Sequence, residues 1–407
     1  MAKIRIAGIG LGGYGRRFAE ALIEQSQAGR VEVAALVDTA PPPDLPRYLE
    51  ALAGDKPAYY TDDEAMLAAH AGLDAVTICT PIYLHEQMVI RALEAGCHVL
   101  CAKPATTTVQ SADRMIAAAR KADRHVLIDF QHVYAHATQQ IKQAIADGRL
   151  GAIKTVVVKM LWPRPDRYYQ RNPGAGRIRL NGNYVLDGPL ANPHSHYILN
   201  ALYFAHPGRD GFAAPVDIQA ELYHCRAIEC EDTASIRCRT DTGVEILMYS
   251  SLCGEVTDDV TEMEICGERG RAVWHFTDYR IETDEGDTGW QPSVRGATEM
   301  VLQRFIDVLN GCARSQVGLA DARQQVLFLN GAYEAAGPIH TIDASYLGTV
   351  EERGDRFRFV TGLHDTVERA AADRCLFSEA GVPWAEPVRP AFNLTGYRQF
   401  DLFKEKK

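Results

Sequence analysis

The feature that most constrains the fold is a run of glycines near the start of the chain, Gly8-Ile9-Gly10-Leu11-Gly12-Gly13. It ends an apolar segment of strand length, Ile4–Ile9, and precedes an amphipathic segment of helical periodicity over 14–27. In a strand–turn–helix unit, glycines permit a tight turn and let a phosphate approach the backbone, while the helix N-terminus supplies N–H groups and a positive dipole end. The pattern predicts a dinucleotide-binding loop, formed by Gly8, Gly10, Leu11, Gly12, Gly13 and Tyr14.

Strand-like and helix-like segments alternate over the first third of the chain. Further apolar runs of strand length lie at 31–37, 75–79, 99–101 and 126–128, with helical patterns at 62–70, 85–95, 108–122 and 134–147. Short apolar strands separated by helices imply right-handed crossovers and a buried parallel sheet. We therefore predict an α/β fold with a doubly wound parallel sheet of the Rossmann type in a domain over residues 1–130.

The pattern changes after Gly151. Strand follows strand over 153–162 and 216–284, separated by turns that contain Gly and Asp, and helical periodicity returns at 297–311 and 320–336. Such a series is typical of an antiparallel sheet. We predict a second, α+β domain with a large, mostly antiparallel sheet over 131–340. Residues 341–407 are expected to form an extension that packs on this domain or covers the cleft.

Composition narrows the class of protein. The chain of 407 residues carries 43 Lys+Arg and 53 Asp+Glu, a formal net charge of −10, which offers no basic footprint for nucleic acid or an anionic membrane. No apolar run is long enough to span a bilayer. The ten cysteines contain no CxxC pair and are typical of reduced core residues. We predict a cytoplasmic protein without a metal site.

The second apolar strand is followed by Asp38, which lies 25 positions after Gly13. An acid at this place accepts hydrogen bonds from an adenosine ribose and repels a 2′-phosphate. Asp38 therefore predicts NAD rather than NADP. A glycine turn without any ligand is the alternative.

Two more turns follow strands, Thr80-Pro81-Ile82-Tyr83-Leu84-His85 and Ala102-Lys103-Pro104. Together with the glycine loop and the antiparallel domain, they resemble the glucose–fructose oxidoreductase / inositol dehydrogenase (Gfo/Idh/MocA) family, which carries TPNxxH-like and EKP-like turns. The resemblance spans roughly residues 3–336 and implies an NAD-dependent oxidoreductase. Here Ile82 replaces the usual Asn, and Ala102 replaces the usual Glu. The cofactor contacts that it implies come from Thr80, Pro81, His85 and Lys103, with a structural role at the start of a helix as the alternative for His85.

The same resemblance implies catalytic residues. The family lysine lies by the nicotinamide and the substrate hydroxyl, and corresponds to Lys103, which can polarise the reacting oxygen or relay a proton. The family also has an Asp four residues before a His, and these positions correspond to Asn192 and His196. Histidine suits proton abstraction from a carbinol at neutral pH, whereas Asn192 can orient a hydroxyl or His196 but cannot act as a carboxylate base. Candidates to take over that role are Asp187, His194 and Tyr184.

A connection rich in Arg and Tyr runs over 162–184, with the sequence WPRPDRYYQRNPGAGRIRLNGNY. Tyrosines stack on sugar faces, and arginines bind carboxylate or phosphate in bidentate fashion. We predict a lid or pocket wall, with a solvated loop as the alternative. The predicted substrate-binding residues are Arg164, Tyr168, Tyr169, Asn192 and His196.

The leading hypothesis is an oxidoreductase that transfers a hydride from a secondary hydroxyl of a sugar, polyol or glycoside, with or without an anionic group, to NAD. Because Asn192 stands where the family has an Asp, a second activity stays open, that of an NAD-dependent glycosidase that works by transient sugar oxidation and elimination. A non-catalytic NAD-binding regulator is the third class, and Lys103 and His196 argue against it. The resemblance also implies a homodimer or homotetramer formed through the open face of the second-domain sheet.

Overall fold

The computed structural model describes residues 3–256, 259–314, 316–352 and 354–402. The chain divides into two compact units. The first contains Met1–Thr106, Gln110–Tyr134 and Gly296–Arg323, and the second contains Thr107–Val109, Ala135–Arg295 and Gln324–Lys407. Helix α8 (Thr298–Leu309), which lies within the range predicted for the second domain, packs against α1 (Gly15–Gln27) of the first unit. The C-terminal extension falls within the second unit.

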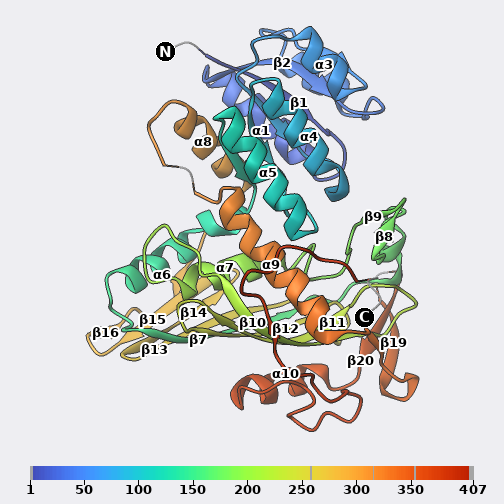
Figure 1. Ribbon diagram of the computed structural model, residues 1–407, viewed down its shortest axis with the longest axis vertical. Helices are drawn as coiled ribbons and strands as arrows, with labels where there is room; N and C mark the ends of the chain where they lie inside the picture. Colours follow the sequence, from blue (N-terminus) through green and yellow to red (C-terminus); the bar gives the residue numbers. More distant parts are fainter. Residues whose placement is uncertain (1–2, 257–258, 315, 353, 403–407) are drawn as a thin grey trace. The chain divides into compact units, whose positions relative to one another are not determined.

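A six-stranded parallel sheet organises the first unit (Figure 1), as the alternating pattern predicted. The strand order is β3-β2-β1-β4-β5-β6. The strands are β1 (Ile4–Ile9), β2 (Val31–Val37), β3 (Ala58–Tyr60), β4 (Ala75–Ile78), β5 (His98–Cys101) and β6 (Val126–Ile128). The order reverses between β1 and β4, so the carboxyl ends of these two strands flank the switch point where ligands bind in open α/β sheets.

Helices connect these strands. They are α1, α2 (Leu45–Ala51), α3 (Asp63–Ala69), α4 (Ile82–Glu94) and α5 (Val109–Ala122), followed by a 3₁₀ turn over Gln131–Tyr134. Helix α1 buries Phe18, Ala21 and Leu22. These positions recur every three to four residues on one side, which is the spacing that packs a helix against a sheet.

A mixed sheet of eleven strands organises the second unit. Its main order is β16-β15-β14-β13-β7-β12-β11-β10-β18, with β17 beside β15 and β21 beside β10. The β7–β12 and β10–β18 pairs are parallel, and the other pairs are antiparallel. The strands are β7 (Ile153–Leu161), β10 (Pro215–His224), β11 (Thr233–Thr240), β12 (Glu245–Ser251), β13 (Val260–Gly267), β14 (Gly270–His275), β15 (Asp278–Thr283), β16 (Gly286–Asp287), β17 (Gln291–Pro292), β18 (His340–Thr341) and β21 (Phe392–Asn393).

Helices cover both faces of this sheet (Figure 1). On one side lie α6 (His136–Ala146), α7 (Ser195–Ala205) and the part of α9 (Leu319–Ala336) from residue 324 onward. Every residue of α7 is buried. A helix that is apolar on all sides is a core element, so α7 gives the side chains at its start a rigid base.

The C-terminal extension covers part of the other face. It contains a 3₁₀ turn (Ala344–Tyr346), the hairpin of β19 (Leu347–Glu352) and β20 (Asp355–Val360), and α10 (Leu363–Ala372). Leu363 and Phe377 pack on Leu247 and Tyr249 of β12, so that β7 and β12 are buried on both faces while β13 alternates. The extension thus covers β7 and β12, which belong to the sheet through which association was predicted.

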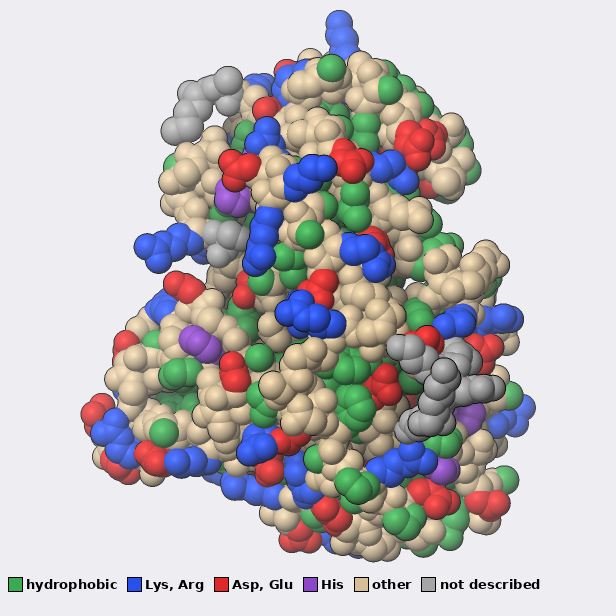
Figure 2. Space-filling view, in the orientation of Figure 1, with side chains coloured by type: hydrophobic (Ala, Val, Ile, Leu, Met, Phe, Trp, Pro, Cys, Tyr) green, Lys and Arg blue, Asp and Glu red, His purple; other side chains and the backbone are tan. Residues whose placement is uncertain are grey.

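The surface matches the ordinary charge content of the sequence. On the face shown in Figure 2, basic and acidic side chains are interspersed. Within the described residues, none of the helices combines the length and the apolar character needed to cross a membrane.

Candidate active site

The glycine loop packs so closely that side chains are excluded at two of its positions. Gly10 has φ +84°, and a Cβ there would lie 2.1 Å from the carbonyl oxygen of Cys79. A Cβ on Gly15 would lie 2.2 Å from the carbonyl oxygen of Gly10, whose own N–H donates to the Val37 carbonyl at 2.8 Å. At these two positions the backbone carries no side chain, which fits the close approach of a pyrophosphate.

Asp38 holds this loop in place. Its Oδ2 accepts hydrogen bonds from the N–H groups of Leu11 (2.8 Å) and Gly12 (3.1 Å). Its Oδ1 has a contact of 3.5 Å with the Thr39 hydroxyl, a distance long enough to leave this oxygen able to accept from a ribose hydroxyl. The sequence predicted the second role and missed the first.

Tyr14 begins a chain of hydrogen bonds within the first unit. It is the N-cap residue of α1, it is about half exposed, and its hydroxyl lies 3.0 Å from the Thr298 hydroxyl. The Gln131 amide donates to the Tyr14 hydroxyl at 3.0 Å, and the Thr298 hydroxyl donates to Asp129 Oδ2 at 2.9 Å. The tyrosine predicted for the cofactor loop is thereby linked to a buried carboxyl group.

That carboxyl group, Asp129, was missed by the sequence analysis. Asp129 is completely buried, directly follows β6, and its Oδ1 has no hydrogen-bond partner in the described part of the chain. Burial raises the pKa of Asp129 to about 8, while the Thr298 hydrogen bond and the charge of Lys103 act in the opposite direction. The available signal was an Asp placed directly after a short apolar strand, at the sheet edge where ligands bind.

Lys103 lies in the turn after β5 and is partly exposed. This turn is connected to the Thr80 turn by His85, whose Nε2 lies 2.9 Å from the Thr80 carbonyl and whose Nδ1 lies 3.0 Å from the Pro104 carbonyl. His85 has no exposed surface, and burial lowers its pKa against the effect of the two carbonyls. In this structure His85 connects the two turns. Pro81 is the N-cap residue of α4.

In the second unit, the amide of Asn192 is held by a carboxylate. Asn192 Nδ2 donates to Asp187 Oδ1 at 3.0 Å. Arg171 Nη2 donates to both Asp187 oxygens at 2.7 and 2.5 Å, and the Gly176 N–H donates to Oδ2 at 3.0 Å. Asp187 therefore brings a negative charge beside Asn192, but the charge is neutralised by Arg171. The contacts of Asp187 therefore suit a role in positioning Asn192.

The other two candidates to replace the family aspartate are bound elsewhere. His194 is fully buried, its Nδ1 lies 2.7 Å from the Ser250 hydroxyl, and its ring meets Trp162 edge-on with centroids 5.1 Å apart. The Tyr184 hydroxyl donates to Asp401 Oδ1 at 3.2 Å, beside the short hairpin of β8 (Arg179–Leu180) and β9 (Asn183–Tyr184). His196 lies in the first turn of α7 and is 6 % exposed.

Glu231 supports the segment that precedes Asn192, and it was also missed. It is completely buried, its Oε1 accepts from the Leu190 N–H at 3.2 Å, and its Oε2 accepts from the Tyr333 hydroxyl. A Cβ on Gly188 would lie 2.2 Å from Oε1, so a larger residue there would displace the Glu231 carboxyl group. Burial raises the pKa of Glu231 to about 7. No sequence pattern marked this residue, because its partners are distant in the chain.

Part of the connection rich in Arg and Tyr lines a cavity of about 710 Å³ in the second unit. Tyr169, from the 3₁₀ turn Asp166–Gln170, is one of its walls. The Arg171 guanidinium lies 3.9 Å from the centroid of the Tyr168 ring. The Arg164 guanidinium lies over the Trp162 ring, and Arg164 pairs with Asp259 at 3.4 Å. The cavity is walled by Asp166, Tyr169, Gln170, Asn172, Pro173, Ala175, Gly176, Arg177, Arg226, Ala227, Ile228, Glu229 and Arg358.

The first unit is thus a Rossmann domain with a cradle for a dinucleotide, and the second is a sheet domain with a polar cavity. Residues 4–130 match the family described as "Oxidoreductase family, NAD-binding Rossmann fold", and residues 138–273 match the "GFO/IDH/MocA C-terminal domain". The two matches together span most of the chain. The chain belongs to the Gfo/Idh/MocA family, as the order of its motifs predicted.

Similar proteins include sugar and polyol dehydrogenases. The D-glucoside 3-dehydrogenase of Escherichia coli (strain K12) is 38 % identical over 166 residues, 40 % of this chain and 43 % of that protein. The myo-inositol 2-dehydrogenase of Thermotoga maritima is 28 % identical over 184 residues, 45 % of this chain and 51 % of that protein. The chain therefore spans about half the length, or less, of these curated relatives.

Solved structures show the same fold. The WlbA dehydrogenase from Bordetella pertussis, in complex with NADH and UDP-GlcNAcA, superposes with a TM-score of 0.68 at 24 % identity. The match covers 82 % of this chain and 97 % of that one. At this identity the likeness concerns the architecture of both units.

Proposed function

We propose that this protein is an NAD-dependent oxidoreductase that removes a hydride from a secondary hydroxyl of a sugar, polyol or glycoside. The observation that carries the proposal is a cluster in the first unit. The glycine loop, the Thr80 turn and the Lys103 turn all follow strands that are neighbours in the sheet, β1, β4 and β5, and His85 connects the last two. The names of the relatives from Escherichia coli and Thermotoga maritima support a polyhydroxylated substrate.

The cofactor would be held by residues that already form a cradle. The main chain of Gly10, Leu11 and Gly12 suits the pyrophosphate, and Asp38 Oδ1 suits a ribose hydroxyl. When bound, NAD accepts the hydride at its nicotinamide ring. Thr80 and Pro81 begin the turn that would flank it.

Two side chains would act on the substrate. The Lys103 ammonium would stabilise the negative charge that develops on the reacting oxygen. His196, inside the fully buried helix α7, would accept the hydroxyl proton, since an imidazole can take up a proton near neutral pH. Asn192, held by Asp187, would orient a substrate hydroxyl. Tyr168, Tyr169 and Arg164 remain proposed substrate contacts, and Tyr169 has the best support because it lines the cavity.

A redox-neutral glycosidase, which oxidises the sugar transiently and returns the hydride, is the second candidate. It is favoured by Asn192 in place of an Asp and by the ion pair of the adjacent Asp187 with Arg171. Retention of NAD through purification, with glycoside cleavage and no accumulation of NADH, would establish this alternative.

The replacement Lys103→Ala tests the proposed function. We expect kcat to fall by about three orders of magnitude, because oxyanion stabilisation and proton transfer are both lost, while the Kd for NAD changes by less than about twofold. The assay is NADH formation with a panel of polyols, uronates and glycosides, and NAD binding is measured by calorimetry. Lys121→Ala, at an exposed position of α5, is the control and should behave as the wild type. Undiminished turnover in Lys103→Ala would disprove the assigned role.

The proposed preference for NAD is tested by Asp38→Asn. The amide oxygen can still accept from the glycine loop, but the negative charge that opposes a 2′-phosphate is gone. We expect the ratio of kcat/KM for NAD over NADP to fall by about tenfold or more. An unchanged ratio would mean that another residue selects the cofactor.

A further inference from the structure

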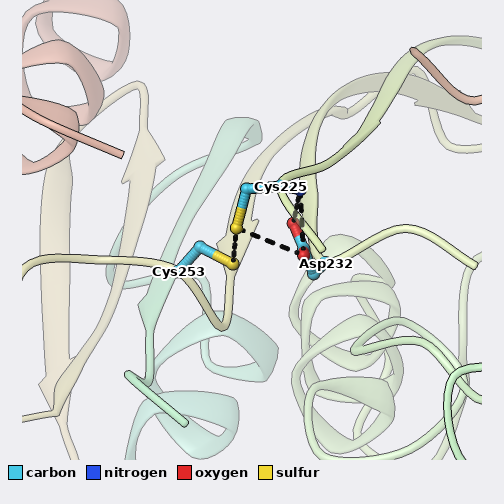
Figure 3. A group of neighbouring side chains, drawn as sticks. All are labelled: Cys225, Asp232 and Cys253. Carbon is cyan, nitrogen blue, oxygen red and sulfur yellow. Dashed lines mark hydrogen bonds between the residues drawn. The ribbon is translucent and has the colours of Figure 1, made fainter. Parts of the chain in front are cut away.

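A pair of buried cysteines in the second unit lies outside the proposed dehydrogenase machinery (Figure 3). Cys225 follows β10 and Cys253 follows β12, and β11 separates these strands in the sheet. The Cys225 and Cys253 Sγ atoms are 2.7 Å apart, and the two residues are 3 % and 0 % exposed. A disulfide bond is about 2.05 Å long, so only a small movement of either side chain separates this geometry from a covalent bond.

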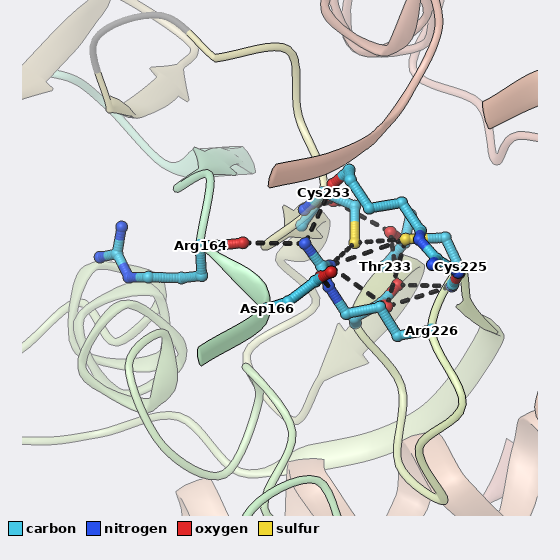
Figure 4. Close-up of polar contacts among 9 residues, drawn as sticks. Arg164, Asp166, Cys225, Arg226, Thr233 and Cys253 are labelled. Atoms are coloured by element: carbon cyan, nitrogen blue, oxygen red, sulfur yellow. Dashed lines mark hydrogen bonds and ion pairs between the residues drawn. The ribbon is translucent and has the colours of Figure 1, made fainter. Parts of the chain in front are cut away.

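Each thiol has a charged neighbour that suits oxidation. The Cys225 thiol donates to Asp232 Oδ2 at 3.4 Å, so a buried carboxylate stands ready to take its proton. Arg226 Nη1 contacts Cys253 Sγ at 2.5 Å and lies 3.7 Å from Cys225 Sγ (Figure 4). Burial raises the pKa of the Cys253 thiol well above its usual range, and the Arg226 guanidinium acts in the opposite direction, in favour of the thiolate.

The same group could be taken for a metal site. The ligating atoms of Cys225, Asp232 and Cys253 lie within 4.8 Å of one another. A structural zinc site uses four protein ligands, and this group, within the part of the chain that the structure describes, has three. The positive charge of Arg226, in contact with one of the sulfurs, opposes a second cation there. The contacts therefore favour a dithiol over a zinc site.

Arg226 also connects the thiols to the cavity. It is one of the cavity walls, together with Asp166 and Arg358. Its Nε donates to Asp166 Oδ1 at 3.0 Å and its Nη2 donates to the Arg164 carbonyl at 2.8 Å (Figure 4). Arg226 therefore both lines the cavity and contacts Cys253.

We propose that Cys225 and Cys253 form a redox-active pair that is oxidised by a peroxide to a reversible disulfide. The Cys253 thiolate attacks one oxygen of the peroxide and the O–O bond breaks, so that Cys253 becomes a sulfenic acid. The departing hydroxide takes up the proton that Cys253 gave up and leaves as water. The sulfur of Cys225, whose proton passes to Asp232, attacks the sulfenic sulfur. The S–S bond forms and the S–O bond breaks. The departing hydroxide takes up that proton as a second water. Two thiols lose two electrons and two protons, and the peroxide is reduced to two waters. A dithiol reductant reverses the step by exchange.

The test uses the full chain, reduced and then exposed to hydrogen peroxide, alkylated without reduction and digested with trypsin. Cys225 lies on the peptide 210–226, and Cys253 lies on 240–269 with Cys266, so fragment ions must separate Cys253 from Cys266. We expect a Cys225–Cys253 link that forms at least about tenfold faster than any other cysteine pair, and that dithiothreitol removes. Absence of this link, or a faster link elsewhere, would overturn the proposal.

Two variants sharpen the result. Cys225→Ser should abolish the link and let a dimedone-reactive sulfenic acid accumulate at Cys253, while Cys238→Ser, a buried cysteine of β11, should leave the link unchanged. The wild-type measurement decides the question even if a variant does not fold. Metal analysis of the purified wild type is the second measurement. Stoichiometric zinc that is lost in Cys225→Ser would overturn the dithiol in favour of a metal site.

Discussion

The glycine loop of the first unit and the segment 187–196 of the second are built in different ways. The loop is shaped by main chain and by Asp38, all within the first 40 residues of the chain except for the Cys79 carbonyl. The second segment depends on side chains from distant parts of the sequence, Arg171, Glu231 and Tyr333. A binding surface made of local backbone is recognisable as a motif, whereas one held by remote side chains is not.

The largest effect is expected in the loop, from Gly10→Ala. The positive φ of Gly10 and the 2.1 Å approach of a Cβ to the Cys79 carbonyl force the backbone to move. We expect a loss of about 3 kcal/mol or more in the free energy of unfolding and an NAD affinity weakened by at least about 100-fold. Urea denaturation and calorimetry measure both.

Gly13→Ala is the matched control for that loop. Gly13 also has a positive φ, +54°, but a Cβ there meets nothing within 4 Å. We expect Gly13→Ala to lower the free energy of unfolding by about 1 kcal/mol, because of backbone strain alone. An equal loss of unfolding free energy in Gly10→Ala and Gly13→Ala would mean that the close approach of Gly10 to the Cys79 carbonyl does not shape the loop.

The segment 187–196 should respond to pH through Glu231. Because burial raises the pKa of Glu231 to about 7, from 4.5 in the unfolded chain, the folded protein holds this proton more tightly. The resulting stabilisation is complete below the unfolded pKa and is lost as pH rises through the folded pKa. This group should lower the free energy of unfolding by up to ~3 kcal/mol between about pH 5 and pH 8.

The replacement Glu231→Gln should remove that slope, since the amide does not titrate. Urea denaturation at the two pH values measures the effect. Glu285→Gln, at an exposed turn, is the control and should keep the wild-type slope. A slope that survives in Glu231→Gln would assign the pH dependence to another group.

The smallest effect is expected from Asp187→Asn. An amide cannot accept from Arg171, Gly176 and Asn192 as the carboxylate does, so Asn192 loses its fixed orientation. We expect kcat to fall by about tenfold with little change in KM. Asp217→Asn, which removes an ion pair with Arg239 at the surface, should leave both constants unchanged. A change confined to KM would instead make Asp187 part of uniform substrate binding.

The parallel sheet and the glycine loop were predictable because each depends on neighbouring residues and on short-range periodicity. The fourth and fifth strands were found for the same reason. The Lys103 turn was identified through the resemblance to the family. Asp129 and Glu231 escaped prediction because a buried carboxyl group has no periodic pattern, and its raised pKa arises from the protein that surrounds it. The helix α8 was predicted as a helix, but its place in the first unit depends on its packing against α1.

The sequence by itself determined that the chain carries a dinucleotide loop and an NAD-binding Rossmann unit, because a tight turn between a strand and a helix is a local property of glycines and apolar runs. The tertiary structure alone decided that Glu231 supports the segment before Asn192, and that Cys225 and Cys253 meet. The cysteine contact depends on the order of strands in the larger sheet, where β11 lies between β10 and β12. Such an order follows from the packing of the whole unit, and no run of neighbouring residues encodes it.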